Sequence, residues 1–261
     1  MYQPDPPRPP QETLPTMYDL PSELVGESGL PDEFHIFQPR LLSDTCQPST
    51  YSTEDFLVAT DLNLYYDVRH PLWYKRPDWY IVLGVPRTSQ QQDLRLSYVI
   101  WQEGVAPFLV VELLSPGTEQ EDLGKTLREV NKPPTKWQVY EQILRVPYYV
   151  VYDRYTNRLR VFRLEGARYQ ELLLPKQRLW IDEIELGLGI WQGTYEEVTG
   201  LWLRWFDESH QWIPIPVEQA IAERQRAEQE HQRAERLAEY LRSIGIDPDN
   251  LPPDVKKFPS E

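Results

Sequence analysis

The chain has 261 residues, of which 40% are hydrophobic, and its formal net charge is −14. This composition is sufficient for a sizeable core, whereas the acidity argues against a general electrostatic nucleic-acid binder, whose domain is usually basic. The only cysteine is Cys46, which excludes intramolecular disulfides and multi-cysteine zinc sites. The single cysteine fits a reducing compartment, and no apolar stretch approaches the length of a membrane span, so we expect a cytoplasmic protein.

The sequence predicts four segments with different composition. They are a Pro-rich acidic arm (residues 1–31), a folded domain (32–215), a charged helix (216–244) and a C-terminal tail (245–261). The negative charge is concentrated at the start, because residues 1–33 carry seven acids and one base. Residues 69–95 carry five bases and two acids, so one basic stretch interrupts an otherwise acidic chain.

The first expected elements are a helix and a set of strands. The helix runs from Asp32, its predicted cap, to Thr45, and Pro39 is expected to kink it. Its apolar face consists of Phe34, Phe37, Leu41 and Leu42. The strands, separated by Pro, Gly and Asp, are Phe56 to Thr60, Leu64 to Tyr66, Trp79 to Leu83, Ser97 to Gln102 and Phe108 to Leu114.

Helical spacing appears next, in Thr135 to Leu144. Two more strands, Tyr148 to Asp153 and Leu159 to Leu164, are predicted on either side of a turn at residues 154–157. Residues 165–215 predict short aromatic strands with turns at Gly187, Gly189, Gly193 and Gly200. The order of strands, helix and strands indicates an α+β domain.

A long surface helix is expected from Glu218 to about Arg242, where Gly and Pro are absent and charge is dense. A 3-4 spacing is compatible with a short coiled coil and a homo-oligomer, and a solvated helix is the alternative. The residues of this seam are Val217, Ala220, Arg224, Ala227, His231, Ala234, Ala238 and Leu241.

Three residues are candidates for chemistry. Glu112 has only apolar neighbours in the strand from Phe108 to Leu114, and a buried carboxylate without a partner costs several kcal/mol. It therefore needs a metal ion, a catalytic proton role, or a structural Lys or Arg partner. Asp78 precedes another apolar strand, and two convergent carboxylates on adjacent strands suit a hard divalent cation.

The third candidate is Lys136, which begins the helix that follows the Glu112 strand. A lysine there can orient a water or stabilise charge on a phosphate, and a solvated surface lysine is the alternative. Lys125 and Lys132 on the intervening loop are rivals for this role. The four histidines have no metal-ligand spacing, and no phosphate-binding glycine loop is present.

Taken as an ordered set, four segments resemble the Uma-two-type restriction-endonuclease family, a branch of the PD-(D/E)xK nuclease superfamily. These segments are Pro77-Asp78, Val110 to Thr118 with Asp122-Leu123-Gly124, Lys136 to Tyr140, and Val146 to Asp153. The resemblance covers roughly residues 55–165. It implies a restriction-endonuclease-like core, a central mixed β-sheet flanked by helices, with a nuclease site dependent on Mg²⁺ or Mn²⁺.

Carried over by position, the resemblance makes Asp78 and Glu112 metal-binding catalytic acids. The superfamily pattern has a lysine two residues after the second acid, but Leu114 occupies that position. Lys136 stands where a lysine relocated to the next helix is expected, with Gln138 and Tyr140 completing the helix pattern.

Two functions follow from these observations. The first is a DNA endonuclease in which the basic stretch holds the DNA backbone, through Arg69, Lys75, Arg76, Arg87 and Arg95. The second is a catalytically silent interaction module, in which the charged helix and acidic arm recruit partners and the two acids form structural ion pairs.

Overall fold

The structure is a computed structural model, and it describes residues 14–16, 19, 33–88, 90–114, 123–124 and 133–248. The chain divides into two compact units, Met1–Ile213 and Pro214–Glu261, which are considered separately. Most of the predicted acidic arm, and Asp32 as a helix cap, fall outside the described residues. The segment boundaries given above therefore stay predictions.

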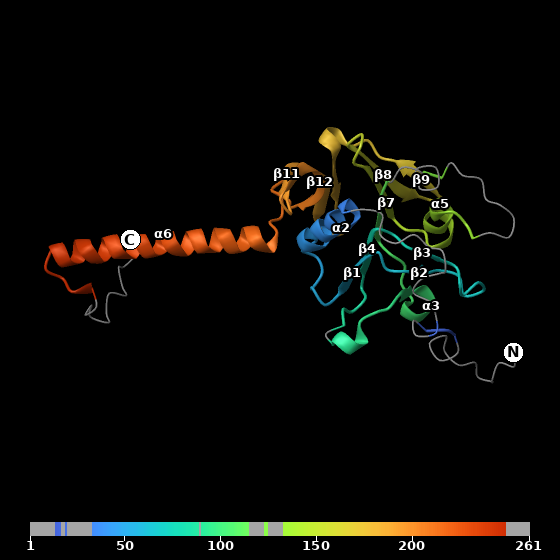
Figure 1. Ribbon diagram of the computed structural model, residues 1–261, viewed down its shortest axis with the longest axis horizontal. Coiled ribbons are helices and arrows are strands. Elements are labelled where there is room, and N and C mark those ends of the chain that lie inside the picture. The colour runs from blue at the N-terminus through green and yellow to red at the C-terminus, as the bar shows by residue number, and fades with distance from the viewer. Residues whose placement is uncertain are drawn as a thin grey trace, which may run out of the picture. The chain divides into compact units, whose positions relative to one another are not determined.

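The first unit is built around a six-stranded mixed sheet, here called sheet A (Figure 1). Its strand order is β1-β4-β6-β7-β8-β9, in which β6 and β7 are parallel and every other neighbouring pair is antiparallel. The strands are β1 (Phe56–Thr60), β4 (Trp79–Leu83), β6 (Leu109–Leu113), β7 (Tyr148–Asp153), β8 (Arg158–Glu165) and β9 (Arg168–Glu171).

Two smaller sheets and several helical elements complete the first unit. Sheet B, in the order β3-β2-β5, consists of β2 (Leu64–Tyr65), β3 (Tyr74–Lys75) and β5 (Tyr98–Val99); sheet C consists of β10 (Arg178–Ile181), β11 (Leu186–Tyr195) and β12 (Val198–Phe206). The helical elements are α2 (Phe34–Thr45), α3 (Ile100–Glu103), α5 (Lys136–Gln138), the π-helical turn η2 (Val139–Ile143), and the 3-10 turns η1 (Gln91–Asp93) and η3 (Pro175–Gln177).

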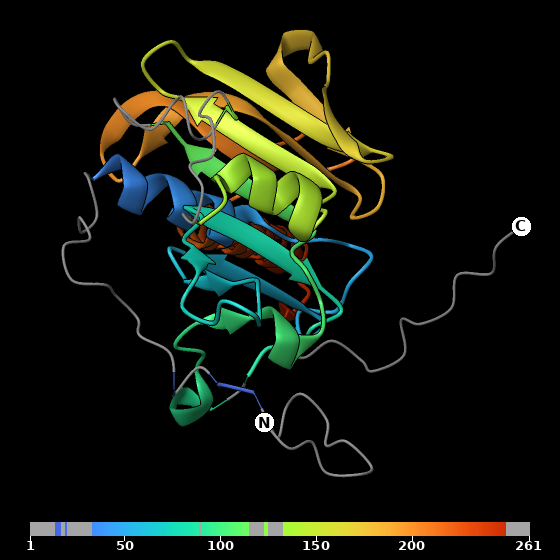
Figure 2. The ribbon, with the colours of Figure 1, turned by 90° about the vertical axis from the view of Figure 1, so that its right-hand side faces the viewer.

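Sheet A is covered on both faces, which explains why its central strands are continuous apolar runs. Every residue of β6 is buried. One core cluster joins Leu42 of α2 and Leu203 of sheet C to alternate residues of β4, β6 and β7. A second cluster joins Val139 and Tyr140 of η2 to the other residues of these strands, whose side chains point to the opposite face of the sheet. The helices α2 and α5 consequently lie on opposite faces of sheet A (Figure 2).

Helix α2 binds sheet C through a buried amide. Gln38 Oε1 accepts a hydrogen bond from the Leu203 N–H at 2.8 Å, and Gln38 Nε2 donates to the Leu203 carbonyl at 2.8 Å. The side chain thus satisfies both backbone groups of one residue of β12, as a neighbouring strand would. Leu41 and Leu42 are buried as expected, whereas Phe34 and Phe37 are only half-buried.

The turns predicted at four glycines of sheet C are wrong. Gly187, Gly189 and Gly193 lie inside β11, and Gly200 lies inside β12. Aromatic rings explain two of these positions: a Cβ atom would come within 2.0 Å of the Phe206 ring at Gly187 and within 1.9 Å of the Trp191 ring at Gly193. Glycine in these strands makes room for a ring.

The strand predicted from Ser97 to Gln102 is also wrong beyond Val99. Only Tyr98–Val99 is extended, and Ile100–Glu103 forms the helical turn α3, which ends at Gly104 in a left-handed conformation. Tertiary contacts override the local β propensity here. The Trp101 indole N–H donates to the Pro15 carbonyl at 2.9 Å.

The second unit contains α6 (Pro216–Ser243), which has no buried residue. The predicted helix is present, and its self-association through the predicted seam stays a prediction. Among the described residues, no helix combines the length and apolar character that crossing a membrane requires.

The ring over Gly187 leads to a stability prediction. Gly187→Ala places a methyl group against the Phe206 ring, and overpacking of this kind lowers the free energy of unfolding by about 1–3 kcal/mol. Gly200→Ala is the matched control, because the nearest atom to its new Cβ lies 3.5 Å away. Urea unfolding of the two variants measures the difference, and equal stability would contradict this account of the glycine.

Candidate active site

Glu112 lies in the centre of sheet A, and its side chain has no exposed surface. Lys136 Nζ lies 2.8 Å from Glu112 Oε2, and the Tyr140 hydroxyl donates to Glu112 Oε1 at 2.8 Å. An ion pair and a hydrogen bond thus compensate the desolvation of this carboxylate. The structure places Lys136 where the sequence predicted it, beside the strand that carries Glu112.

Asp78 precedes β4 and is half-buried. Its Oδ2 accepts a hydrogen bond from the Leu113 N–H at 2.6 Å. The antiparallel register pairs Trp79 with Val111, so one further residue along β4 and β6 brings Asp78 opposite Glu112. Because directly opposed residues share a face of a sheet, both carboxylates lie on the face covered by α5.

Local sequence explains how α5 presents its lysine. Thr135 caps the helix in a capping box, in which its hydroxyl accepts from the Gln138 N–H and the Gln138 side chain accepts from the Thr135 N–H. Lys136 and Tyr140 are four residues apart and therefore share one helical face. The π-helical turn η2 contains Tyr140, and π-helical turns occur frequently at functional sites.

Glu141 joins this turn to β9, the edge strand of sheet A. Its Oε1 accepts from the Tyr169 N–H at 2.9 Å, and its Oε2 accepts from Arg168 at 3.0 Å. Burial raises the pKa of Glu141, but hydrogen bonds from Tyr169, Gln142 and Arg168 outweigh it and hold the pKa below its ordinary value. Two neighbouring residues of η2 thus have different roles. Tyr140 donates a hydrogen bond to Glu112, and Glu141 attaches the turn to β9.

The two carboxylates fit a hard divalent cation by their chemistry. Mg²⁺ is usually bound by one or two protein carboxylates and retains several waters. A carboxylate has about four acceptor positions, so it can bind a cation and accept hydrogen bonds at the same time. Within the part of the chain that the structure describes, no group of three or more His, Cys, Asp or Glu side chains could hold a metal ion.

Most of the chain matches a known protein family. A family model described as "Uma2: Putative restriction endonuclease" matches residues 18–194, more than half of the chain. The chain belongs to the Uma2 family. This membership supports a nuclease, and the sheet flanked by helices is the expected restriction-endonuclease-like α+β fold.

One solved structure resembles this Uma2-family chain over much of its length. It is described as a "putative nuclease belonging to DUF820 from Anabaena variabilis ATCC 29413". The match has 14% sequence identity and a TM-score of 0.40, and it covers 65% of this chain and 90% of that chain. Curated proteins give no match.

The predicted DNA-binding bases are only partly available in the structure. Arg76 Nε lies 3.1 Å from Asp61, and Arg95 binds both carboxylate oxygens of Glu103 at 2.6 and 3.2 Å. The hydrogen bond that Arg95 donates to Glu103 raises the pKa of Arg95. Arg87 is exposed and Lys75 is half-buried. Arg69 is exposed and pairs with Asp67. Phosphate contacts by Arg69, Arg76 and Arg95 would compete with these acids.

Sequence reasoning missed two contacts of the site. Tyr140 belongs to the expected helix pattern, but no local signal predicts its hydrogen bond to Glu112. His35 of α2 is buried, and its Nε2 lies 3.2 Å from the Leu113 carbonyl oxygen. No local pattern marks His35, because it approaches β6 from the other face of sheet A. Lys125 and Lys132 lie outside the described residues.

Removing the Tyr140 hydroxyl tests the support of the buried acid. A hydrogen bond to a charged group contributes about 1.5–3 kcal/mol, so we expect Tyr140→Phe to lower the free energy of unfolding by about that amount. Tyr240→Phe, at an exposed position of α6, is the control and should leave it unchanged. Urea denaturation measures both variants; indistinguishable curves would show that the bond adds nothing.

The lowered pKa of Glu141 leads to a pH prediction. A carboxyl whose folded pKa is depressed stabilises the fold above its unfolded pKa of about 4.3, and this contribution disappears as pH falls through the folded pKa. Glu141→Gln should therefore be less stable than the wild type near neutrality, with the difference shrinking as pH falls below about 4. Urea midpoints across this range measure the effect, and a difference that does not change with pH would contradict it.

Proposed function

We propose that this Uma2-family chain is a DNA endonuclease that depends on a divalent metal, Mg²⁺ or Mn²⁺. The observation that supports the proposal best is the convergence of Asp78, Glu112 and Lys136. They come from the position just before β4, from β6 and from α5. Family membership supports the coarser assignment as a nuclease. The identity of the metal, the choice of DNA and the roles of individual residues belong to the proposal.

Asp78 and Glu112 are the residues that would hold the metal ion. When bound, a divalent cation neutralises phosphate charge and lowers the pKa of a bound water. The Leu113 N–H fixes the orientation of Asp78 through its 2.6 Å hydrogen bond. Tyr140 and Lys136 fix Glu112, so both acids are held in place by the protein itself, which reduces the reorganisation needed for catalysis.

Lys136 provides the positive charge that phosphodiester hydrolysis needs. Its side chain is partly exposed whereas Glu112 is fully buried, with 22% and 0% of the respective side-chain surface exposed. The ammonium group can therefore contact a phosphate at the surface while it remains close to the acid. In the reaction, a water oxygen bonds to phosphorus and the bond from phosphorus to one sugar oxygen breaks. That oxygen takes up a proton, for which Lys136 Nζ is a donor within the site. The attacking water releases one proton to solvent, and the lysine regains its proton from solvent, so the protons balance.

DNA is held in this proposal by the basic stretch, with Lys75, Arg76, Arg87 and Arg95 as phosphate contacts. Arg76 and Arg95 are paired with the carboxylates of Asp61 and Glu103. When DNA binds, a phosphate therefore replaces the carboxylate as the partner of each arginine. Affinity should fall as salt rises, since phosphate contacts release counterions.

The second candidate function is a silent interaction module. One observation favours it: the contact between Lys136 and Glu112 at 2.8 Å is complete without a metal ion, as a structural ion pair would be. The two functions differ in a measurable way. Neutralising Glu112 abolishes DNA cleavage if the chain is a nuclease, whereas an interaction module has no cleavage activity to lose.

Glu112→Gln is the decisive variant for the nuclease. It keeps the size of the side chain and its hydrogen bond with Tyr140, but removes the charge that attracts a cation. We expect Mg²⁺-dependent nicking of supercoiled plasmid to fall by at least about 100-fold, as for removal of a principal catalytic group. Thermal stabilisation by Mg²⁺ should disappear as well.

The control is Glu235→Gln, at an exposed acid of α6, which should keep full activity. Wild-type protein that neither nicks DNA nor gains thermal stability from Mg²⁺ or Mn²⁺ would favour the interaction module. Full nicking activity in a folded Glu112→Gln protein would refute the proposed site.

The role of Lys136 is tested against its two rivals. Lys136→Met should reduce nicking at least about 10-fold, because it removes the ammonium while retaining the length of the side chain. Lys125→Met and Lys132→Met should retain activity. If one of the rivals is inactive and Lys136→Met remains active, the site lysine has been misassigned.

A further inference from the structure

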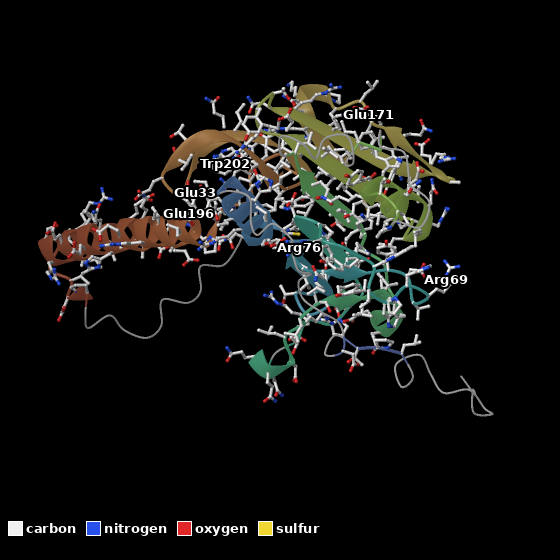
Figure 3. The ribbon with its side chains drawn as sticks, turned by 45° about the vertical axis from the view of Figure 1, so that its right-hand side comes forward. Glu33, Arg69, Arg76, Glu171, Glu196 and Trp202 are labelled. Carbon is white, nitrogen blue, oxygen red and sulfur yellow. The ribbon has the colours of Figure 1, made fainter. Side chains whose placement is uncertain are left out.

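A cavity of about 640 Å³ lies between the start of α2, the turn from β7 to β8 and the hairpin of β11 and β12. Its size is within the range typical of small-molecule sites. Glu33 and Trp202, both labelled in Figure 3, belong to its lining. None of the acids or the lysine of the candidate active site lines it, so it is a separate feature of the first unit.

Strand register relates the cavity to the active site. The parallel strands β6 and β7 pair Leu113 with Tyr152, and the cavity-lining Arg154 follows Tyr152 by two residues. Phe34, another lining residue, precedes His35, whose ring contacts the Leu113 carbonyl. The cavity and Glu112 are therefore at the same end of sheet A, with the cavity toward the α2 face and Glu112 on the α5 face.

One wall of the cavity is aromatic. The Phe34 ring stacks against Trp202 with centroids 5.7 Å apart and an angle of 25° between planes. The Tyr152 ring lies next to Phe34, with centroids 6.1 Å apart, and the Tyr152 hydroxyl donates to the Leu201 carbonyl at 2.8 Å. Trp202 and Tyr152 are buried, with 3% and 0% of their surface exposed, so the half-buried Phe34 is the ring of this wall that a base can contact. Stacking of a base on an aromatic ring depends little on base identity.

The rim of the cavity is polar and includes a cation. The Arg154 guanidinium lies 4.9 Å from the centre of the Phe34 ring. Asp153 holds the turn by accepting hydrogen bonds from the Tyr155 N–H at 2.9 Å and the Thr156 hydroxyl at 2.6 Å. The amides of Asn157 and Gln192, also in the lining, can donate to and accept from the edge of a base.

Gly200 leaves the cavity open beside Trp202. A Cβ atom at Gly200 would lie 3.5 Å from Trp202 Nε1, so a side chain fits there without a clash with the backbone. The Trp202 Nε1–H is buried and has no hydrogen-bond partner among the described residues. A buried donor without an acceptor among the described residues is uncommon in native structures.

We propose that this cavity binds one unpaired base of a DNA strand whose backbone passes over the end of sheet A toward Asp78 and Glu112. The inference rests on the proposed function and specifies its substrate: a single-stranded or locally unpaired region beside the cut. Stacked and paired bases in a duplex cannot enter such a cavity, and an unpaired base can. Arg154 is placed to contact the phosphate that accompanies the base.

The test measures binding of single-stranded oligonucleotides of about 12 nucleotides by fluorescence anisotropy. The protein is the full chain carrying Glu112→Gln, which prevents cleavage, and the second oligonucleotide has abasic sites at its central positions. We expect the intact oligonucleotide to bind about 10-fold more tightly than the abasic one, because base stacking contributes that order of affinity. Gly200→Leu fills the cavity and should reduce this preference to near unity.

Two further variants keep the test independent of any folding defect in Gly200→Leu. Arg154→Gln, at the rim, should weaken binding of the intact oligonucleotide about 5-fold or more, the order expected for a lost charged contact. Arg158→Gln is the control, since Arg158 is exposed, pairs with Glu171 at 3.9 Å and does not line the cavity. It should retain the preference.

Equal affinity of the parent protein for the two oligonucleotides would overturn the inference, as would a preference unchanged by both Gly200→Leu and Arg154→Gln. Plasmid nicking by the wild type separates this failure from failure of the proposed function. Metal-dependent nicking without a base preference would refute the cavity alone. A base preference without any nicking would refute the nuclease and keep the cavity as a nucleic-acid site.

Discussion

The Glu112 side chain lies in an apolar strand and has no exposed surface. The residues around it are arranged so that a lysine and a tyrosine stabilise its charge. Lys136 and Tyr140 reach it only because Thr135 and Gln138 cap α5 at one point of the chain. The π-helical turn places Tyr140 over the acid while Glu141, the next residue, fastens the turn to β9. A buried ion pair contributes little net stability compared with apolar packing, so an arrangement of this cost is more readily explained by chemistry than by folding.

The opposite face of sheet A is organised by packing and by buried amides. Gln38 completes the hydrogen bonds of Leu203, and α2 is thereby joined to sheet C. Glycines in sheet C accommodate the rings of Phe206 and Trp191. His35 connects this layer to the Leu113 carbonyl, so the strand that carries Glu112 has polar contacts from both faces. The candidate active site and the cavity lie on opposite faces of sheet A at the same strand ends.

Membership of the Uma2 family and the geometry at Glu112 point in the same direction, toward hydrolysis of nucleic acid. The acidity of the chain is compatible with the proposed substrate, because a nuclease that selected unpaired DNA would need local contacts more than a uniformly basic surface. An aromatic wall with one arginine provides such contacts. The ion pairs of Arg76 and Arg95 reduce the attraction for duplex phosphates, which agrees with a substrate recognised partly through a base.

The sequence by itself determined most of the strands of sheet A, the helix after β6, and the order of acid, acid and lysine. These features are local: apolar runs bounded by Pro, Gly and Asp define strands, and a period change defines a helix. Tertiary structure alone decided that His35 meets Leu113, that Arg95 is held by Glu103, and that the glycines of sheet C lie under rings instead of in turns. The same is true of the cavity, whose walls join the start of α2 to segments more than a hundred residues later in the chain. Side-chain partners of this kind depend on strand register and on which layer covers which face, and no local pattern in a single sequence records either.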